Sequence, residues 1–307
     1  MKTDVASKRS MPSPDLIDRL SAMRLAAPAA RARRGIGERA SRMSGPGMEF
    51  ADFRTYRAGD DLRHVDPRSI AHGTPVTRKY VQRQQILVTI VLDLTPSMMV
   101  EDKAALAKGI ARALGFVTLA AQDRLRIFVL DENPGLKRSP TWHGRARVHE
   151  MIEFAEPRTQ GPGGPSERTR PDPASLSAPI SDLIGDSDAG SIVFILSDFW
   201  GTGLSEPLAA LTATGAMVIA MHILAASERD PSSMGNGIIR LVDAETGRER
   251  DMALDDITLT AYHAAMSRHT DGLREALIGG NVYLPVAAEE TLSDVCLKRL
   301  TAAGIIV

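Results

Sequence analysis

The sequence has little of what disulfide-linked, membrane-spanning or base-stacking proteins need. A single cysteine, Cys296, excludes an internal disulfide and a cysteine-based zinc site, and its apolar neighbours predict a buried side chain. The two longest apolar runs, 86–92 and 216–226, are far shorter than the roughly 20 residues that cross a bilayer. The first residues lack an apolar stretch after their charges, so we predict no secretory signal and a cytoplasmic location.

The signatures of common enzyme classes are also missing. There is no Walker phosphate loop and no Gly-x-Ser-x-Gly elbow. The glycines at 35 and 37 mimic a dinucleotide fingerprint, but no predicted strand precedes them. The sequence therefore predicts a protein that is not an enzyme.

Charge is unevenly distributed although the net charge is only −1. Residues 1–85 hold 17 Lys/Arg against 9 Asp/Glu, and the remaining residues hold 20 against 29. Five arginines in residues 31–42 could contact nucleic acid. The few aromatic residues (two Trp, four Tyr and seven Phe) do not interleave with this basic run, which argues against base stacking. The other interpretation is that the basic front segment packs on the acidic remainder of the chain.

Apolar β-branched runs alternate with helical patterns from residue 86 onward. This alternation predicts an α/β, Rossmann-like fold with a mostly parallel central sheet of about six strands and helices on both faces. We predict a disordered tail over 1–14, an N-terminal appendage over 15–85 with a helix over 15–34 that is interrupted near Pro28, and the α/β domain over 86–307. The predicted strands are 86–93, 124–132, 191–198, 216–224 and 281–287. The predicted helices are 101–122, 144–156, 175–185, 204–215, 255–280 and 289–304. A loop is predicted over 157–173 and a β-hairpin over 238–254.

Two of the predicted central strands end in aspartate, Asp93 and Asp198. In open parallel sheets, binding sites form beyond the carboxyl ends of the strands. Asp93 is followed by hydroxyl residues at Thr95 and Ser97, so hard oxygen ligands suited to Mg²⁺, Mn²⁺ or Ca²⁺ gather there. The alternative is that Asp93 and Ser97 only cap the helix that follows.

This arrangement resembles the metal-ion-dependent adhesion site of von Willebrand factor type A domains, Asp-x-Ser-x-Ser followed by a distant Thr and a distant Asp. The resemblance implies a metal site of Asp93, Thr95, Ser97 and Asp198, with Mg²⁺ as the first candidate ion. Ala174 stands where the family has its distant Thr, and Ser175, Thr169 or Thr159 are possible substitutes. In such a site a partner's Glu or Asp side chain completes the coordination of the ion.

A second motif precedes the predicted sheet and is harder to meet by chance. It runs from Glu49-Phe50 through Arg54, Tyr56 and Gly59-Asp60-Asp61 to Arg63, Asp66, Pro67 and Arg68. With parts of 240–247 and 304–306, it resembles the bacterial family called "domain of unknown function 58", in which a Trp usually stands where this chain has Pro67. From the residues alone, pairing of the aspartates with the arginines could equally serve to fix an irregular segment.

That resemblance implies an accessory role. Members of the family are usually encoded beside MoxR-type AAA ATPases and are thought to help the ATPase act on a client, for example in assembling or metallating methanol dehydrogenase. We therefore expect a non-enzymatic adaptor whose partners are a MoxR-type ATPase and a client protein. A metal-dependent hydrolase and a nucleic-acid-binding protein remain the alternatives.

Overall fold

A computed structural model describes residues 11–26, 48–57, 65–71, 75–82, 85–131, 136–156, 176–201, 203–235 and 237–307. Contacts divide the chain into a large unit, residues 1–35 with 86–307, and a small unit, residues 36–85. The small unit ends where the boundary of the α/β domain was predicted. The division differs from the predicted one at its other end, because residues 14–26 pack with the large unit. Residues 1–10 of the predicted tail and the basic segment 31–42 lie outside the described residues.

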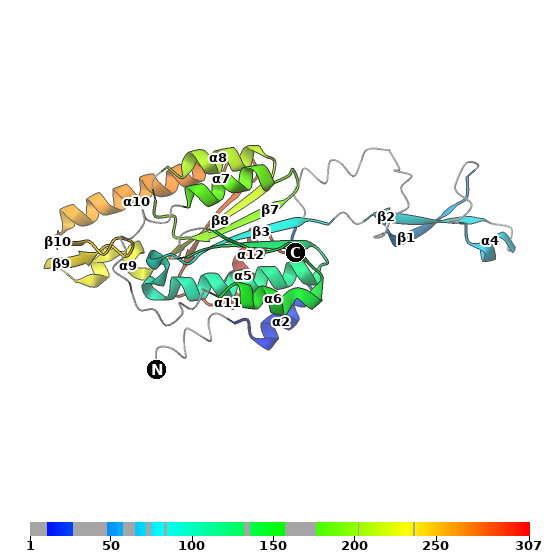
Figure 1. Ribbon diagram of the computed structural model, residues 1–307, viewed down its shortest axis with the longest axis horizontal. Helices are drawn as coiled ribbons and strands as arrows, with labels where there is room; N and C mark the ends of the chain where they lie inside the picture. The colour runs from blue at the N-terminus through cyan, green and yellow to red at the C-terminus, as the bar shows by residue number, and fades with distance from the viewer. Residues whose placement is uncertain are drawn as a thin grey trace. The chain divides into compact units, whose positions relative to one another are not determined.

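The large unit is built on a mostly parallel sheet (Figure 1). Its strand order is β11-β8-β7-β3-β4, and all neighbours in this series are parallel. Two short antiparallel strands, β5 (Lys137–Arg138) and β6 (Trp142–His143), pair with β4 and bring the sheet to seven strands, which the sequence did not predict. The parallel strands are β3 (Leu87–Asp93), β4 (Arg124–Leu130), β7 (Ile192–Ser197), β8 (Met217–Leu224) and β11 (Val282–Ala287), each close to its predicted range.

Chain order reverses between β3 and β7. From β3 the chain moves to β4 on one side, then returns to β7 on the other side and continues outward to β8 and β11. Crossover connections therefore leave the carboxyl ends of β3 and β7 on opposite faces of the sheet, and in open α/β sheets binding sites form at such a position. The fold thus places the ends of these two strands where a binding site is expected.

Helices cover both faces of the sheet (Figure 1). The buried side chains of β3 alternate, with Val88, Ile90 and Leu92 in one core cluster and Val91 in the other. A strand buried on both faces reads as a continuous apolar run, which is why β3 was recognisable from the sequence. One face carries α2 (Pro14–Ser21), α5 (Lys103–Ala120), α6 (Val148–Phe154) and the C-terminal helical segment 292–302, and the other carries α7 (Ser177–Asp186), α8 (Ser205–Ala213) and α10 (Asp256–Ala276).

Helix α2 is short and is fixed at both ends. The Ser13 hydroxyl accepts a hydrogen bond from the Leu16 N–H, and Pro14 occupies the first turn, where a missing N–H does no harm. Leu16 and Leu20 are buried against the large unit, and Leu25 forms a bridge to Ile306. The helix ends at Ser21, earlier than the predicted range of 15–34.

A β-hairpin follows β8 as predicted. It consists of β9 (Gly237–Val242) and β10 (Glu249–Leu254), which pair with each other only. In its turn, the Asp243 carboxylate accepts hydrogen bonds from the N–H groups of Glu245 and Thr246, both at 2.9 Å. This local bonding fixes the direction in which the turn presents Glu245.

The described residues of the small unit form a two-stranded antiparallel sheet and one short helix. β1 (Met48–Thr55) pairs with β2 (Val76–Gln82), and α4 (Pro67–Ala71) lies between them in sequence. Pro67 opens α4, a position that suits proline, and Asp66 accepts a hydrogen bond from the Arg68 N–H. Asp60, Asp61 and Arg63, for which pairing was considered, lie outside the described residues.

The remaining short elements are η2 (Pro96–Asp102), η3 (Arg145–Arg147), α9 (Ala226–Arg229) and η4 (Pro231–Met234), and the C-terminal segment is divided into α11 (Leu292–Asp294), a π-helical turn (Val295–Arg299) and α12 (Leu300–Ala302). Within the described part of the chain, no helix has the length and apolar character required to span a membrane.

Cys296 is fully buried, as the sequence predicted, and burial raises the pKa of its thiol to about 12. We expect the native protein to resist an aromatic disulfide reagent at pH 8, because the thiolate is the reacting form. In denaturant, one thiol per chain should react. Cys296→Val serves as the control, and rapid labelling of the native protein would contradict the burial.

Candidate functional site

Asp93 and Asp198 lie at the carboxyl ends of the neighbouring strands β3 and β7. The two strands pair in parallel up to Leu92 and Leu196, so their aspartates follow at the same edge of the sheet. Both carboxylates are buried. We call this place, together with the loops that follow β3 and β7, the carboxyl edge. The convergence predicted from the sequence is therefore present.

The Asp93 carboxylate is held by hydroxyl and amide donors. Its Oδ1 accepts hydrogen bonds from the Thr95 N–H at 3.0 Å and the Thr95 hydroxyl at 2.7 Å, and its Oδ2 accepts one from the Ser197 hydroxyl at 2.6 Å. The Thr95 and Ser97 hydroxyl oxygens are 3.2 Å apart. Asp93, Thr95 and Ser97 thus form a compact cluster of hard oxygen atoms. The bond to the Thr95 N–H also orders the start of η2, so a local structural role is present as well.

Burial, followed by the charge of Asp198, raises the pKa of Asp93 to about 6. The hydrogen bonds from Ser197 and Thr95 act in the opposite direction because they stabilise the carboxylate. The two carboxylates are therefore close enough to repel each other, and a positive charge between or beside them would be favourable.

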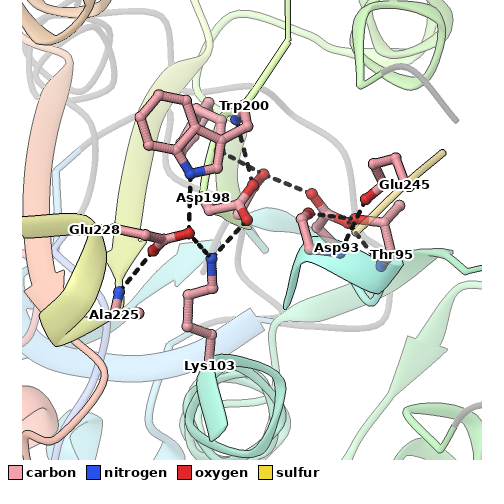
Figure 2. Close-up of polar contacts among 11 residues, drawn as sticks. Asp93, Thr95, Lys103, Asp198, Trp200, Ala225, Glu228 and Glu245 are labelled. Atoms are coloured by element: carbon pink, nitrogen blue, oxygen red, sulfur yellow. Dashed lines mark hydrogen bonds and ion pairs between the residues drawn. The ribbon is translucent and has the colours of Figure 1, made fainter. Parts of the chain in front are cut away.

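Such a positive charge is supplied by the chain itself. The Lys103 ammonium lies 2.8 Å from Asp198 Oδ2 and also contacts the Glu228 carboxylate (Figure 2). Lys103 is 0% exposed. The other oxygen of Asp198 accepts a hydrogen bond from the Trp200 N–H at 3.3 Å. Both oxygens of Asp198 are consequently engaged within the protein.

A further carboxylate, that of Glu245, reaches the carboxyl edge from the hairpin. Glu245, in the β9–β10 turn, accepts a hydrogen bond from the Ser97 N–H at 2.9 Å (Figure 2). The two residues are 148 positions apart in the sequence. The backbone amide at the start of η2 is thus able to hold a carboxylate group.

The predicted divalent-ion site can be compared with these contacts. The hydroxyl and carboxylate oxygens of Asp93, Thr95 and Ser97 have the chemistry of Mg²⁺ ligands. Asp198, the fourth predicted ligand, is instead neutralised by an ammonium, and a second cation beside Lys103 would be repelled by it. The donor set therefore does not fit the ion in the way the motif implied. Ala174 and its possible substitutes at 175, 169 and 159 lie outside the described residues.

Four residues of the site were missed by sequence analysis: Lys103, Ser197, Glu228 and Glu245. One of them had a detectable signal. Lys103 stands at the head of the apolar stripe of α5, with Leu106, Ile110 and Leu114 at helical spacing behind it. A lysine on such a stripe needs a buried partner, although the pattern does not identify it.

Apolar side chains are exposed in the loops around the carboxyl edge. Met99 in η2 is 52% exposed and Trp200, after β7, is 43% exposed, and Val100 is also partly open to solvent. The Trp200 indole stacks on the His269 ring and donates a hydrogen bond to Glu228. Exposed methionine and tryptophan held in place in this way are typical of protein-binding surfaces.

The buried His222 on β8 predicts a pH dependence of stability. Burial, followed by His269, lowers its pKa to about 3, and its Nδ1 lies 2.6 Å from the Tyr283 hydroxyl. Between pH 6.5 and 3 the unfolded chain binds a proton at this residue that the folded chain does not. The free energy of unfolding therefore decreases as the pH is lowered through this window. When the pH is lowered from 7 to 5, we expect the free energy of unfolding of both proteins to decrease. The decrease should be about 2 kcal/mol smaller for His222→Phe than for wild type. Urea titrations at both pH values measure this difference, and equal losses would contradict it.

Comparisons with known proteins agree with the family resemblance. "Uncharacterized protein Rv1480" of Mycobacterium tuberculosis and "Uncharacterized protein Mb1516" of Mycobacterium bovis are each 26% identical over 249 residues, covering 79% of this chain and 75% of their own. Among solved structures, "conserved hypothetical protein BatB" from Bacteroides thetaiotaomicron matches with a TM-score of 0.40 and 14% sequence identity. The match covers 71% of this chain and 96% of that protein, and the similarity is too low to support an argument about function. The family model described as "Protein of unknown function DUF58" matches residues 52–272, and the chain belongs to this family.

Proposed function

We propose that this chain is a non-enzymatic adaptor that binds a partner protein at the carboxyl edge of a von Willebrand type A-like domain. The observation that carries the proposal is the Glu245 carboxylate on the Ser97 N–H. It supports binding of a carboxylate at this position, and a partner's Glu or Asp side chain has the same chemistry. No step of the proposal depends on Mg²⁺, because Asp198 is already bound to Lys103.

The surroundings of Ser97 supply the rest of the binding surface. Met99, Val100 and Trp200 offer apolar area from the two loops that follow β3 and β7. A polar anchor surrounded by aromatic and methionine side chains is the usual composition of an interface hot spot. The partner's chemistry is therefore an acidic side chain flanked by apolar residues.

The proposed partners are a MoxR-type AAA ATPase and a client protein. Membership of the DUF58 family supports this assignment, because the family resemblance implies an accessory role beside such an ATPase. In this role the chain would act as the link that presents a client to the ATPase. An adaptor needs a binding surface and no catalytic base, and exposed apolar side chains in the loops of the carboxyl edge offer such a surface.

Substitution of Met99 by Lys tests the binding surface. Met99 is exposed, so the fold should tolerate the change, while a charge in the centre of the interface should weaken binding of a purified MoxR-type ATPase from the same organism at least about tenfold. Binding is measured by biolayer interferometry. The matched control is Ile278→Lys, because Ile278 is 73% exposed and precedes β11 at the opposite edge of the sheet. If both variants weakened binding equally, the carboxyl edge would not be the binding surface.

Substitution of Glu245 by Ala tests the carboxylate position. If a partner carboxylate uses the Ser97 N–H, removal of the resident carboxylate should strengthen partner binding, because nothing then has to be displaced. The same interferometry assay measures the change. Glu249→Ala, in the same hairpin and exposed, is the control and should leave the affinity unchanged. If Glu245→Ala bound the partner with unchanged affinity, the partner would not use the Ser97 N–H.

A further inference from the structure

Lys103 occupies an unusual place for a lysine. It is the first residue of α5, is completely buried, and lies above the apolar stripe of that helix. Basic side chains are disfavoured at helix N-termini, where the unpaired N–H groups already create positive potential. Removal of an ammonium from water is also unfavourable unless oppositely charged groups replace the lost solvation. The position therefore requires strong compensation.

Two carboxylates provide this compensation. Asp198 comes from the end of β7 and Glu228 from α9, so the Lys103 ammonium joins three separate parts of the chain (Figure 2). Glu228 is itself fixed, because it accepts hydrogen bonds from the Ala225 N–H at 2.7 Å and from Trp200 Nε1 at 3.0 Å. The ammonium thus lies in a preformed cage of acceptors.

We propose that Lys103 is the resident cation of the carboxyl edge and takes the place of a divalent metal ion, so that Asp198 is ion-paired and the edge is ordered without metal. The ammonium has the role that a metal ion would have there. It forms ion pairs with Asp198 and Glu228, and these two carboxylates in turn bind Trp200 and so fix its loop. Capture of a partner at this edge is then independent of divalent ions. Only this last consequence rests on the proposed function; the metal-free site does not.

Metal binding to the full-length wild-type chain tests the inference directly. Mn²⁺ is titrated in, and free Mn²⁺ is followed by electron paramagnetic resonance. Thermal unfolding is recorded in Mg²⁺ and in EDTA. We expect no saturable one-to-one binding and the same Tm in both solutions. Stoichiometric Mn²⁺ binding that is lost in Asp198→Asn, or a Tm that rises with Mg²⁺ and falls with EDTA, would overturn the proposal and restore the metal site.

Variants test whether Lys103 and Asp198 neutralise each other. Lys103→Met keeps the aliphatic volume and leaves Asp198 as an uncompensated buried charge, so its Tm should fall by about 10 °C. Lys103→Met combined with Asp198→Asn should be more stable than Lys103→Met alone. Additive losses in the double variant would show that Lys103 only fills space and would contradict the inference.

A matched control is available on the same helix. Lys108 is partly exposed and pairs with the half-exposed Glu156 at 3.4 Å, so Lys108→Met should shift the Tm by only about 1–2 °C. If Lys103→Met does not fold, the wild-type Mn²⁺ titration still decides the question. Neither measurement uses a partner protein, so failure of the adaptor role would appear separately, in the interferometry of the Met99 and Glu245 variants.

Discussion

The buried ion pair between Lys103 and Asp198 is the interaction on which the carboxyl edge depends. It connects the N-terminus of α5 to the end of β7, across the position where the order of strands reverses. At such a position the crossover connections leave to opposite faces of the sheet, so the loops that follow the two strands diverge. A charged contact in a low-dielectric environment is strong enough to do so, and it fixes the geometry because removal of either partner leaves an isolated buried charge.

The sheet and its order of elements were largely predictable because they depend on local patterns. β3, β7 and β8 are buried on both faces, so each appears in the sequence as an unbroken apolar run. The short strands β5 and β6 were missed because two residues carry no periodicity and their pairing with β4 depends on tertiary contacts. The helix predicted over 15–34 ends early, at Ser21, since the chain turns there to place Leu25 beside Ile306.

The site was predictable only in part, for a similar reason. Strand ends can be identified from the sequence, so the meeting of Asp93 and Asp198 followed from the parallel order of β3 and β7. Contacts from distant segments cannot be identified in this way. Glu228 lies in the short helix α9 and Glu245 in the turn of the hairpin, and no pattern in the sequence indicates that either side chain reaches the carboxyl edge. The motif drew attention to the oxygen atoms of Asp93, Thr95 and Ser97, which lie together, but could not show that a lysine from the following helix pairs with Asp198.

The balance of charge at the carboxyl edge determines what kind of partner can bind there. Asp198 and Glu228 share the Lys103 ammonium, and Asp93 lies near Asp198, so the net charge of these groups does not attract a further anion. In the proposed complex, a partner carboxylate would take the place of Glu245 on the Ser97 N–H and would keep that hydrogen bond. Glu245 would stay attached to the hairpin, so the exchange would add a negative charge to the edge and would gain nothing electrostatically. Under the proposal, the net affinity would therefore come from the apolar area that the partner covers, and Met99, Val100 and Trp200 would discriminate between partners.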